Sequence, residues 1–175
     1  MANHMWICPT KKQDEFYNIR KLMPLLKSEF PQFKFYYDEV TEEDNFYGGE
    51  YFITVAQKDI DYLFGMALWT NCSMVDKSEI IDELDKMGKE QLGDKLIDYI
   101  ENGSANTEKC IEIRHTQFYK EIDVVTDWMR WYFGALIFDE GIYPIYVEPL
   151  KEKPNTQVPS PAQSFIKSFK TWLKS

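Results

Sequence analysis

The chain has few of the residues from which small catalytic or metal centres are usually built. Its 175 residues include only 3 cysteines and 2 histidines. Cys8, Cys72 and Cys110 are odd in number and widely spaced, with no CxxC pair, which argues against a disulfide framework and against a zinc site. This cysteine usage is typical of a reducing compartment. We therefore expect a cytoplasmic protein that holds no metal and no other cofactor.

Long hydrophobic runs and recognisable motifs are also missing. No apolar stretch approaches the roughly 20 residues that a membrane-spanning helix needs. The start, MANHMWICP, lacks the basic flank and long apolar core of a signal peptide, and residues 1–4 are either native or a cloning remnant. The sequence contains no GxxxxGK[ST], no GxGxxG and no HExxH. We predict no transmembrane segment and no catalytic residues, and hence a protein that is not an enzyme.

Positive charge is in deficit. The chain has 20 basic and 29 acidic residues, a net charge of −9, and an isoelectric point near 4.8. A surface of this kind repels the phosphates of nucleic acids and anionic lipids. The acidity therefore argues against direct nucleic-acid binding and favours a basic protein partner, although it also serves solubility alone.

Apolar and aromatic residues are abundant, at 44% and 16%, which is enough for a substantial core. Their spacing alternates in some segments, as in strands, and follows helical periodicity in others. The expected fold is α+β: one mixed, mainly antiparallel sheet with packed helices, in a single domain over residues 1–150. The segment 62–69 is left open between a strand and a buried helix turn. Expected strands are 5–8, 33–37, 51–55, 110–115, 135–138 and 142–147, and expected helices are 16–26, 76–101 and 122–133.

Local signals refine this outline. The stretch Thr10-Lys11-Lys12-Gln13 matches a capping box at the start of the first helix. Pro24 is expected to kink or divide that helix. Gly48-Gly49 suits a hairpin connection. Pro144 indicates that the last strand lies at a sheet edge, since proline cannot donate to a ladder.

The last 25 residues differ in character from the rest. Residues 151–159 are polar and contain proline, as a linker does, and residues 160–173 follow as an amphipathic helix. The segment 151–175 has five lysines and one glutamate, a net charge of +4, which leaves −13 on residues 1–150. We expect this basic helix to dock on its own domain or on a neighbouring copy, and the second case gives a homodimer. Contact with a membrane surface or a partner is the remaining alternative.

An acidic loop, residues 38–50, is the strongest candidate for a functional site. No basic residue lies between Lys34 and Lys58. Crowded carboxylates repel one another unless a basic group neutralises them. Carboxylates on the loop would speed the encounter with a basic partner, and its aromatic rings would slow dissociation of the complex. The alternative is a solvated loop with no binding role. The candidate partner-binding residues are Asp38, Glu39, Glu42, Glu43, Asp44, Phe46, Tyr47 and Glu50.

Two other patterns point to function more weakly. The segment 76–101 is rich in carboxylates, but its interspersed lysines indicate an ordinary helix surface more than a mimic of nucleic acid. Glu112-Ile113-Arg114 has the acidic-x-basic form found in some metal-dependent nucleases, without a convincing acidic partner upstream. Cys110 and His115 are separated by an odd number of residues, so in a strand they face opposite sides and form no Cys–His pair. A structural role is expected for His115.

The stretch 122–147 runs helix, Gly134, strand, Asp139-Glu140-Gly141, strand. With the acidic, aromatic composition, this layout resembles the small α/β immunity proteins of bacterial toxin–immunity pairs. The resemblance implies a cytosolic inhibitor that occludes the active site of its toxin.

The leading hypothesis is therefore a non-enzymatic binding protein, an immunity or antitoxin-type inhibitor whose acidic loop meets a basic partner. The alternative is a phage or mobile-element inhibitor of host defence, acting by mimicry of nucleic acid. A small enzyme with an unrecognised site is the third possibility.

Overall fold

The fold is described here from a computed structural model. The described residues are 3–41, 49–69, 110–115, 120–139, 143–146 and 148–157, with single positions at Ser78, Asp82, Asp85, Lys86 and Gly88. In chain order the elements are β1 (Asn3–Cys8), α1 (Gln13–Phe16), α2 (Ile19–Glu29), β2 (Lys34–Glu39), β3 (Tyr51–Gln57), β4 (Ile60–Trp69), β5 (Cys110–His115), α5 (Lys120–Tyr132), β6 (Leu136–Asp139) and β7 (Tyr143–Tyr146).

The described strands form one seven-stranded sheet in the order β2-β3-β4-β5-β1-β6-β7. Each of the pairings between these strands is antiparallel. The chain thus has the α+β fold that its periodicity predicts. The apolar segment 62–69, left open above, belongs to a strand, since β4 covers Ile60–Trp69.

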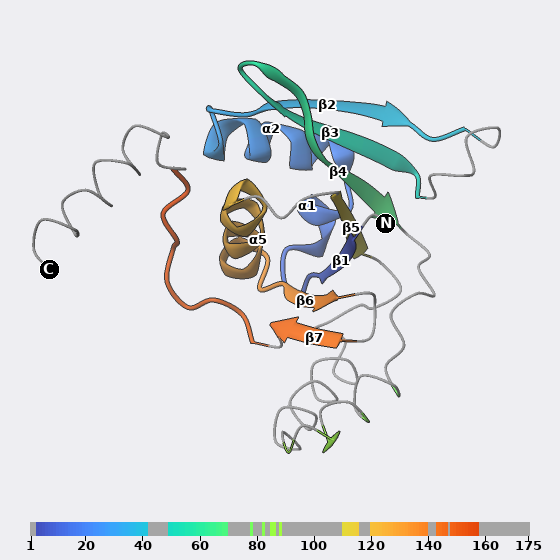
Figure 1. The fold of residues 1–175 in the computed structure, drawn as a ribbon, viewed down its shortest axis with the longest axis vertical. Coiled ribbons are helices and arrows are strands. Elements are labelled where there is room, and N and C mark those ends of the chain that lie inside the picture. The colour runs from blue at the N-terminus through green and yellow to red at the C-terminus, as the bar shows by residue number, and fades with distance from the viewer. Residues whose placement is uncertain are drawn as a thin grey trace, which may run out of the picture.

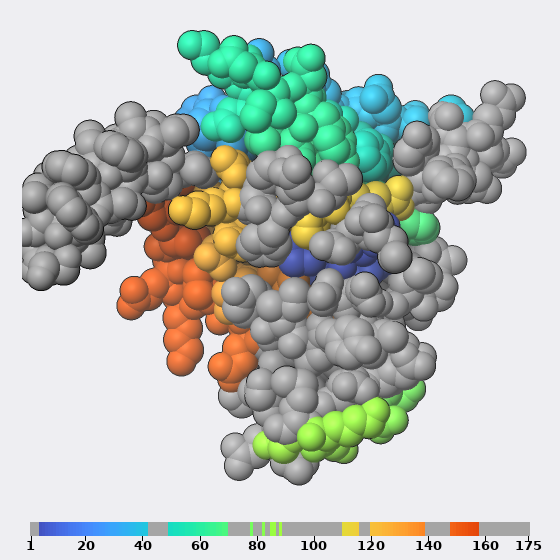
Figure 2. Space-filling view, in the orientation of Figure 1, coloured from blue at the N-terminus to red at the C-terminus, as the bar shows by residue number. Residues whose placement is uncertain are grey.

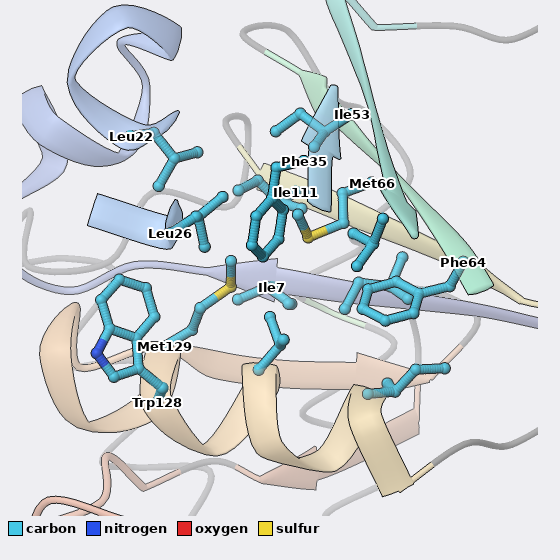
Figure 3. Close-up of a cluster of buried hydrophobic side chains, with 14 of the residues drawn as sticks. Ile7, Leu22, Leu26, Phe35, Ile53, Phe64, Met66, Ile111, Trp128 and Met129 are labelled. Atoms are coloured by element: carbon cyan, nitrogen blue, oxygen red, sulfur yellow. The ribbon is translucent and has the colours of Figure 1, made fainter. Parts of the chain in front are cut away.

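Helices α2 and α5 pack on one face of this sheet and enclose the hydrophobic core (Figures 1 and 3). Successive strand residues point to opposite faces, and alternate residues of β1, β3, β4 and β5 lie in this core. Burial of these side chains is the main favourable contribution to folding. The side chains labelled in Figure 3 are Leu22 and Leu26 of α2, Trp128 and Met129 of α5, and Ile7, Phe35, Ile53, Phe64, Met66 and Ile111 of the strands.

The opposite face of the sheet is buried as well near its centre. Trp6, Ala67, Cys110 and Phe138 point away from the helices, and each is at most 3% exposed. The predicted strand 110–115 is confirmed as β5, and it is buried on both faces apart from the half-buried Arg114. Periodicity separates the two faces of a strand, but it does not say whether the second face meets solvent.

The N-terminal helical region is divided at a different place from the one expected. The capping box at Thr10 is not formed, because α1 begins after Lys12, which has a left-handed backbone and makes no side-chain cap. A new helix, α2, then begins at Ile19, and the side chain of its N-cap residue Asn18 accepts the N–H of Arg20 at 3.1 Å. Pro24 lies within α2 and does not end it.

Thr10 instead joins the end of β1 to the end of α5. Its hydroxyl donates to the carbonyl of Gly134 at 2.8 Å, and its N–H donates to the carbonyl of Phe133 at 3.1 Å. Gly134 has a φ of +57°, which favours glycine. A Cβ at this position would lie 2.4 Å from the Thr10 hydroxyl oxygen, so both its conformation and its contact require glycine.

The two ends of the sheet are formed by hairpins. β2 pairs with β3, as Gly48-Gly49 suggests, and Gly49 has a φ of +82°. β6 pairs with β7, which is the terminal strand, so the prediction from Pro144 is confirmed.

Residues 148–157, which include the described part of the expected linker 151–159, have no helix or strand and lie alongside α2 and α5 (Figure 1). Lys153 forms an ion pair with Glu29 at 2.9 Å, and Gln32 donates to the carbonyl of Thr156 at 2.8 Å. The expected C-terminal helix and the segment 76–101, apart from its five single positions, lie outside the described residues. Within the described part of the chain, no helix has the length and apolarity to span a bilayer.

Candidate functional site: an acidic, aromatic edge of the sheet

The structure describes part of the predicted acidic loop. Asp38 and Glu39 end β2, and Glu50 directly precedes β3; all three are exposed. Because β2 and β3 are antiparallel neighbours, these three carboxylates lie at the same end of the hairpin. The remaining predicted residues, Glu42, Glu43, Asp44, Phe46 and Tyr47, lie outside the described residues.

Two tyrosines join these carboxylates at the surface. Tyr36 is 56% exposed and Tyr37 is 43% exposed, which makes them two of the four most exposed large hydrophobic residues described. They point to opposite faces of the sheet, because they are adjacent in a strand. We use the name acidic edge for the five residues Tyr36, Tyr37, Asp38, Glu39 and Glu50.

The position of β2 explains this exposure. It is the terminal strand of the sheet, and its end reaches beyond α2, which covers only its beginning (Figure 1). Phe35 is accordingly 3% exposed, whereas the next residue on the same face, Tyr37, is 43% exposed and lies against the ring of Tyr51 at a centroid distance of 6.1 Å. Figure 2 shows β2, β3 and β4 along the upper surface of the molecule.

Backbone hydrogen bonds hold the carboxylate end of the hairpin in place. The N–H of Val40 donates to the carbonyl of Glu50 at 2.9 Å, and the N–H of Glu50 donates to the carbonyl of Leu68 at 2.8 Å. The pairing of β2 with β3 runs without a shift from Lys34 opposite Ala56 to Glu39 opposite Tyr51. The acidic edge is thus displayed by a regular ladder and does not depend on its own side chains for shape.

The acidic edge carries negative charge that no described basic residue pairs with. Among the described residues, no lysine or arginine forms an ion pair with Asp38, Glu39 or Glu50. Lys34 is the basic residue of β2, and it lies at the opposite end of the strand. The edge therefore offers three exposed carboxylates and two phenol rings to a partner.

A second cluster, which the sequence pattern did not reveal as buried, surrounds Glu112 of β5. Glu112 is 2% exposed, and its carboxylate accepts hydrogen bonds from Trp69 Nε1 at 3.0 Å and from the Arg114 guanidinium at 2.7 Å. The imidazole of His4 also pairs with it. A buried carboxylate requires such partners, because an unpaired charge away from water is costly.

Strand register brings the Glu112 cluster together. Arg114 lies between His4 of β1 and Gly65 of β4, and Glu112 lies between Trp6 and Ala67. The absence of a side chain at Gly65 makes room for the ring of Phe52, since a Cβ at Gly65 would lie 2.3 Å from that ring.

The Glu112 cluster is arranged for stability more than for chemistry. Each carboxylate oxygen of Glu112 already accepts at least one hydrogen bond. Among the residues the structure describes, no group of three histidine, cysteine, aspartate or glutamate side chains is placed to hold a metal ion. The acidic-x-basic pattern of Glu112 and Arg114 is therefore an internal ion pair, and His115 is buried at the end of β5.

A shallow hollow of about 530 Å³ lies between the end of α2 and the linker. Among the described residues that line it, Glu29 alone is titratable, and it is already paired with Lys153. The described lining thus contains no acid–base pair. Its lining residues are Ser28, Glu29, Pro31, Gln32, Thr156 and Gln157.

Comparison with protein-family models, with curated proteins and with solved structures gives no match for this chain.

Proposed function

We propose that this chain is a non-enzymatic inhibitor that binds a basic protein partner through the acidic edge. The observation that carries this proposal is the exposure of Tyr36 and Tyr37 beside Asp38 and Glu39 on the terminal strand of the sheet. Tyrosine rings are enriched among the residues that dominate binding energy, because they bury a large rigid area with little loss of entropy.

The charges of the acidic edge add rate and selectivity to this contact. A protein of net charge −9 attracts a basic partner over several ångströms, and three local carboxylates orient it at the edge. Toxins that act on nucleic acids and carry a basic surface have the positive charge that such a partner needs. We therefore infer an immunity or antitoxin-type role in the cytoplasm, in which the bound chain blocks access to the partner's active site.

The test uses two charge-reversed variants as bait beside the wild-type protein. One carries Asp38→Lys, Glu39→Lys and Glu50→Lys. The matched control carries Asp14→Lys, Asp59→Lys and Asp61→Lys, which change net charge equally at exposed positions away from the acidic edge. A basic protein from the native host that the wild type and the control capture, and the edge variant does not, is the expected partner.

The captured partner also separates the inhibitor classes. A toxin whose activity stops on binding supports the immunity role. A DNA-handling defence protein that DNA displaces from the complex supports the anti-defence alternative. Equal capture by all three baits contradicts binding at the acidic edge.

A further inference from the structure

The outer side of β2 presents backbone groups that no described strand pairs with, because β2 ends the strand order. The hydrogen bond from Val40 to Glu50 identifies which groups these are. Along an antiparallel strand, residues whose backbone N–H and C=O groups point toward the partner strand alternate with residues whose groups point away from it. The backbone N–H and C=O groups of Val40 therefore point toward β3, and so do those of Asp38 and Tyr36. The N–H and C=O groups of Phe35, Tyr37 and Glu39 therefore point outward.

The two edge strands of the sheet differ in whether their outward backbone groups can pair with another strand. β7, at the other edge, contains Pro144, which has no N–H to offer to an incoming strand. β2, with the sequence KFYYDE, has neither proline nor glycine, and its pairing with β3 contains no bulge. Bulges and prolines are common ways to block an edge. The β2 edge carries neither, so its outward N–H and C=O groups keep the regular spacing with which another strand can pair.

We propose that β2 binds an extended segment of the basic partner by strand addition, with the partner's main chain pairing to the outward groups of Tyr37 and Glu39. This inference rests on the proposed function and specifies its mode. Main-chain hydrogen bonds supply affinity in such complexes, and alternate side chains supply selectivity.

The side chains of β2 define the chemistry of the added strand. Asp38 and Glu39 point to opposite faces, so the added strand carries lysine or arginine on both faces at this end. Tyr36 and Tyr37 flank the next positions with rings, which suit β-branched residues or a stacked guanidinium. The occupant is thus an extended, lysine- or arginine-bearing segment. A second copy of the chain is disfavoured as occupant by a net charge of −9 on each molecule.

The test uses a short synthetic peptide in which lysine alternates with valine, and a twin peptide with N-methylated backbone amides. Both have the same charge, but only the first can form a ladder. The protein is used as wild type and with Glu39→Pro or Glu39→Ala. Both substitutions remove one carboxylate, and only proline also removes an outward N–H, a change that an edge strand tolerates.

We expect the first peptide to slow hydrogen exchange at the amides of Tyr37 and Glu39, with little change at Tyr36 and Asp38, which already face β3. N-methylation of the peptide, or Glu39→Pro relative to Glu39→Ala, is expected to weaken binding roughly tenfold or more, as loss of one or two backbone hydrogen bonds does. The peptide arm needs only the wild-type protein, so it stands even if Glu39→Pro unfolds β2.

The contradicting results are distinct. Equal binding of both peptides, and equal affinity of the proline and alanine variants, overturns strand addition and leaves side-chain binding at the acidic edge intact. Undiminished peptide and partner binding by the variant with Asp38→Lys, Glu39→Lys and Glu50→Lys overturns the proposed function itself. Protection of the Tyr37 amide that grows with protein concentration, without peptide, makes a second copy the occupant and also overturns the proposal.

Discussion

The indole of Trp69 donates a hydrogen bond to the carboxylate of Glu112 at 3.0 Å and so connects β4 to β5 across the face opposite the helices. The same carboxylate pairs with Arg114 at 2.7 Å and with His4 of β1. One acidic side chain thus links three neighbouring strands at the centre of the sheet.

Removal of this carboxylate is expected to destabilise the fold. Glu112→Ala leaves the Arg114 charge without its partner, and breaking a buried pair in this way costs about 3 kcal/mol or more of unfolding free energy. Glu112→Gln should cost less, because the amide oxygen still accepts a hydrogen bond. Urea denaturation measures both, with Glu39→Ala as the exposed control. Equal stability of Glu112→Ala and Glu39→Ala would falsify this role.

The connection between β1 and α5 gives a second prediction. Gly134→Ala forces a side chain into a left-handed backbone and against the Thr10 hydroxyl, so we expect a loss of about 2 kcal/mol. Thr10→Ser should be nearly neutral, since it keeps the hydroxyl that binds the Gly134 carbonyl. Thermal unfolding of the wild type and of both variants measures these changes in stability. A Gly134→Ala protein as stable as the wild type shows that this glycine is not required.

Alkaline pH should weaken the fold through Tyr17. Burial, and then the neighbouring thiols of Cys8 and Cys110, raise the pKa of the Tyr17 phenol above its ordinary value of 10.0. The folded state then keeps a proton that the unfolded state loses. The stabilising contribution is fully present below pH 10.0 and is lost as the pH rises above it. Tyr17→Phe should therefore reduce the fall of unfolding free energy with pH, and an unchanged slope would count against the effect.

The exposed and buried aromatic residues of β2 should respond differently to substitution. Tyr36→Ala is expected to leave stability within about 0.5 kcal/mol, because the ring is mostly exposed. It should weaken partner binding roughly tenfold, as truncation of an interface tyrosine does. Phe35→Ala should instead cost about 3 kcal/mol of stability, because it opens a cavity in the core. Calorimetric binding and unfolding measurements separate the two. Loss of stability without loss of binding in Tyr36→Ala would contradict its role at the edge.

Alternation and helical spacing predicted most elements, because burial of one face imposes a period that the sequence displays. Ile122, Val125 and Met129 follow helical spacing within the expected helix 122–133, and all three are buried in α5. The order of the strands could not be predicted from the sequence. β5 lies between β4 and β1, and these pairings join residues more than 40 positions apart, which local patterns do not encode. The burial of Glu112 was missed for the same reason, since it depends on partners from other strands.

The candidate site was predicted in part. Asp38, Glu39 and Glu50 were predicted from the run without basic residues, and the structure places all three at the surface. Tyr36 and Tyr37 were missed, because aromatic residues in a strand-like sequence indicate a core position. Their exposure follows from β2 being terminal and extending past α2, which no local pattern encodes.

The most direct test of binding at the acidic edge is the association rate of the purified partner at increasing ionic strength. For the wild type and for the control with Asp14→Lys, Asp59→Lys and Asp61→Lys, we predict fast association that slows steeply with salt. For the variant with Asp38→Lys, Glu39→Lys and Glu50→Lys, we predict slow association with little dependence on salt. An edge variant that associates as fast as the control, with the same dependence on salt, would contradict the proposal.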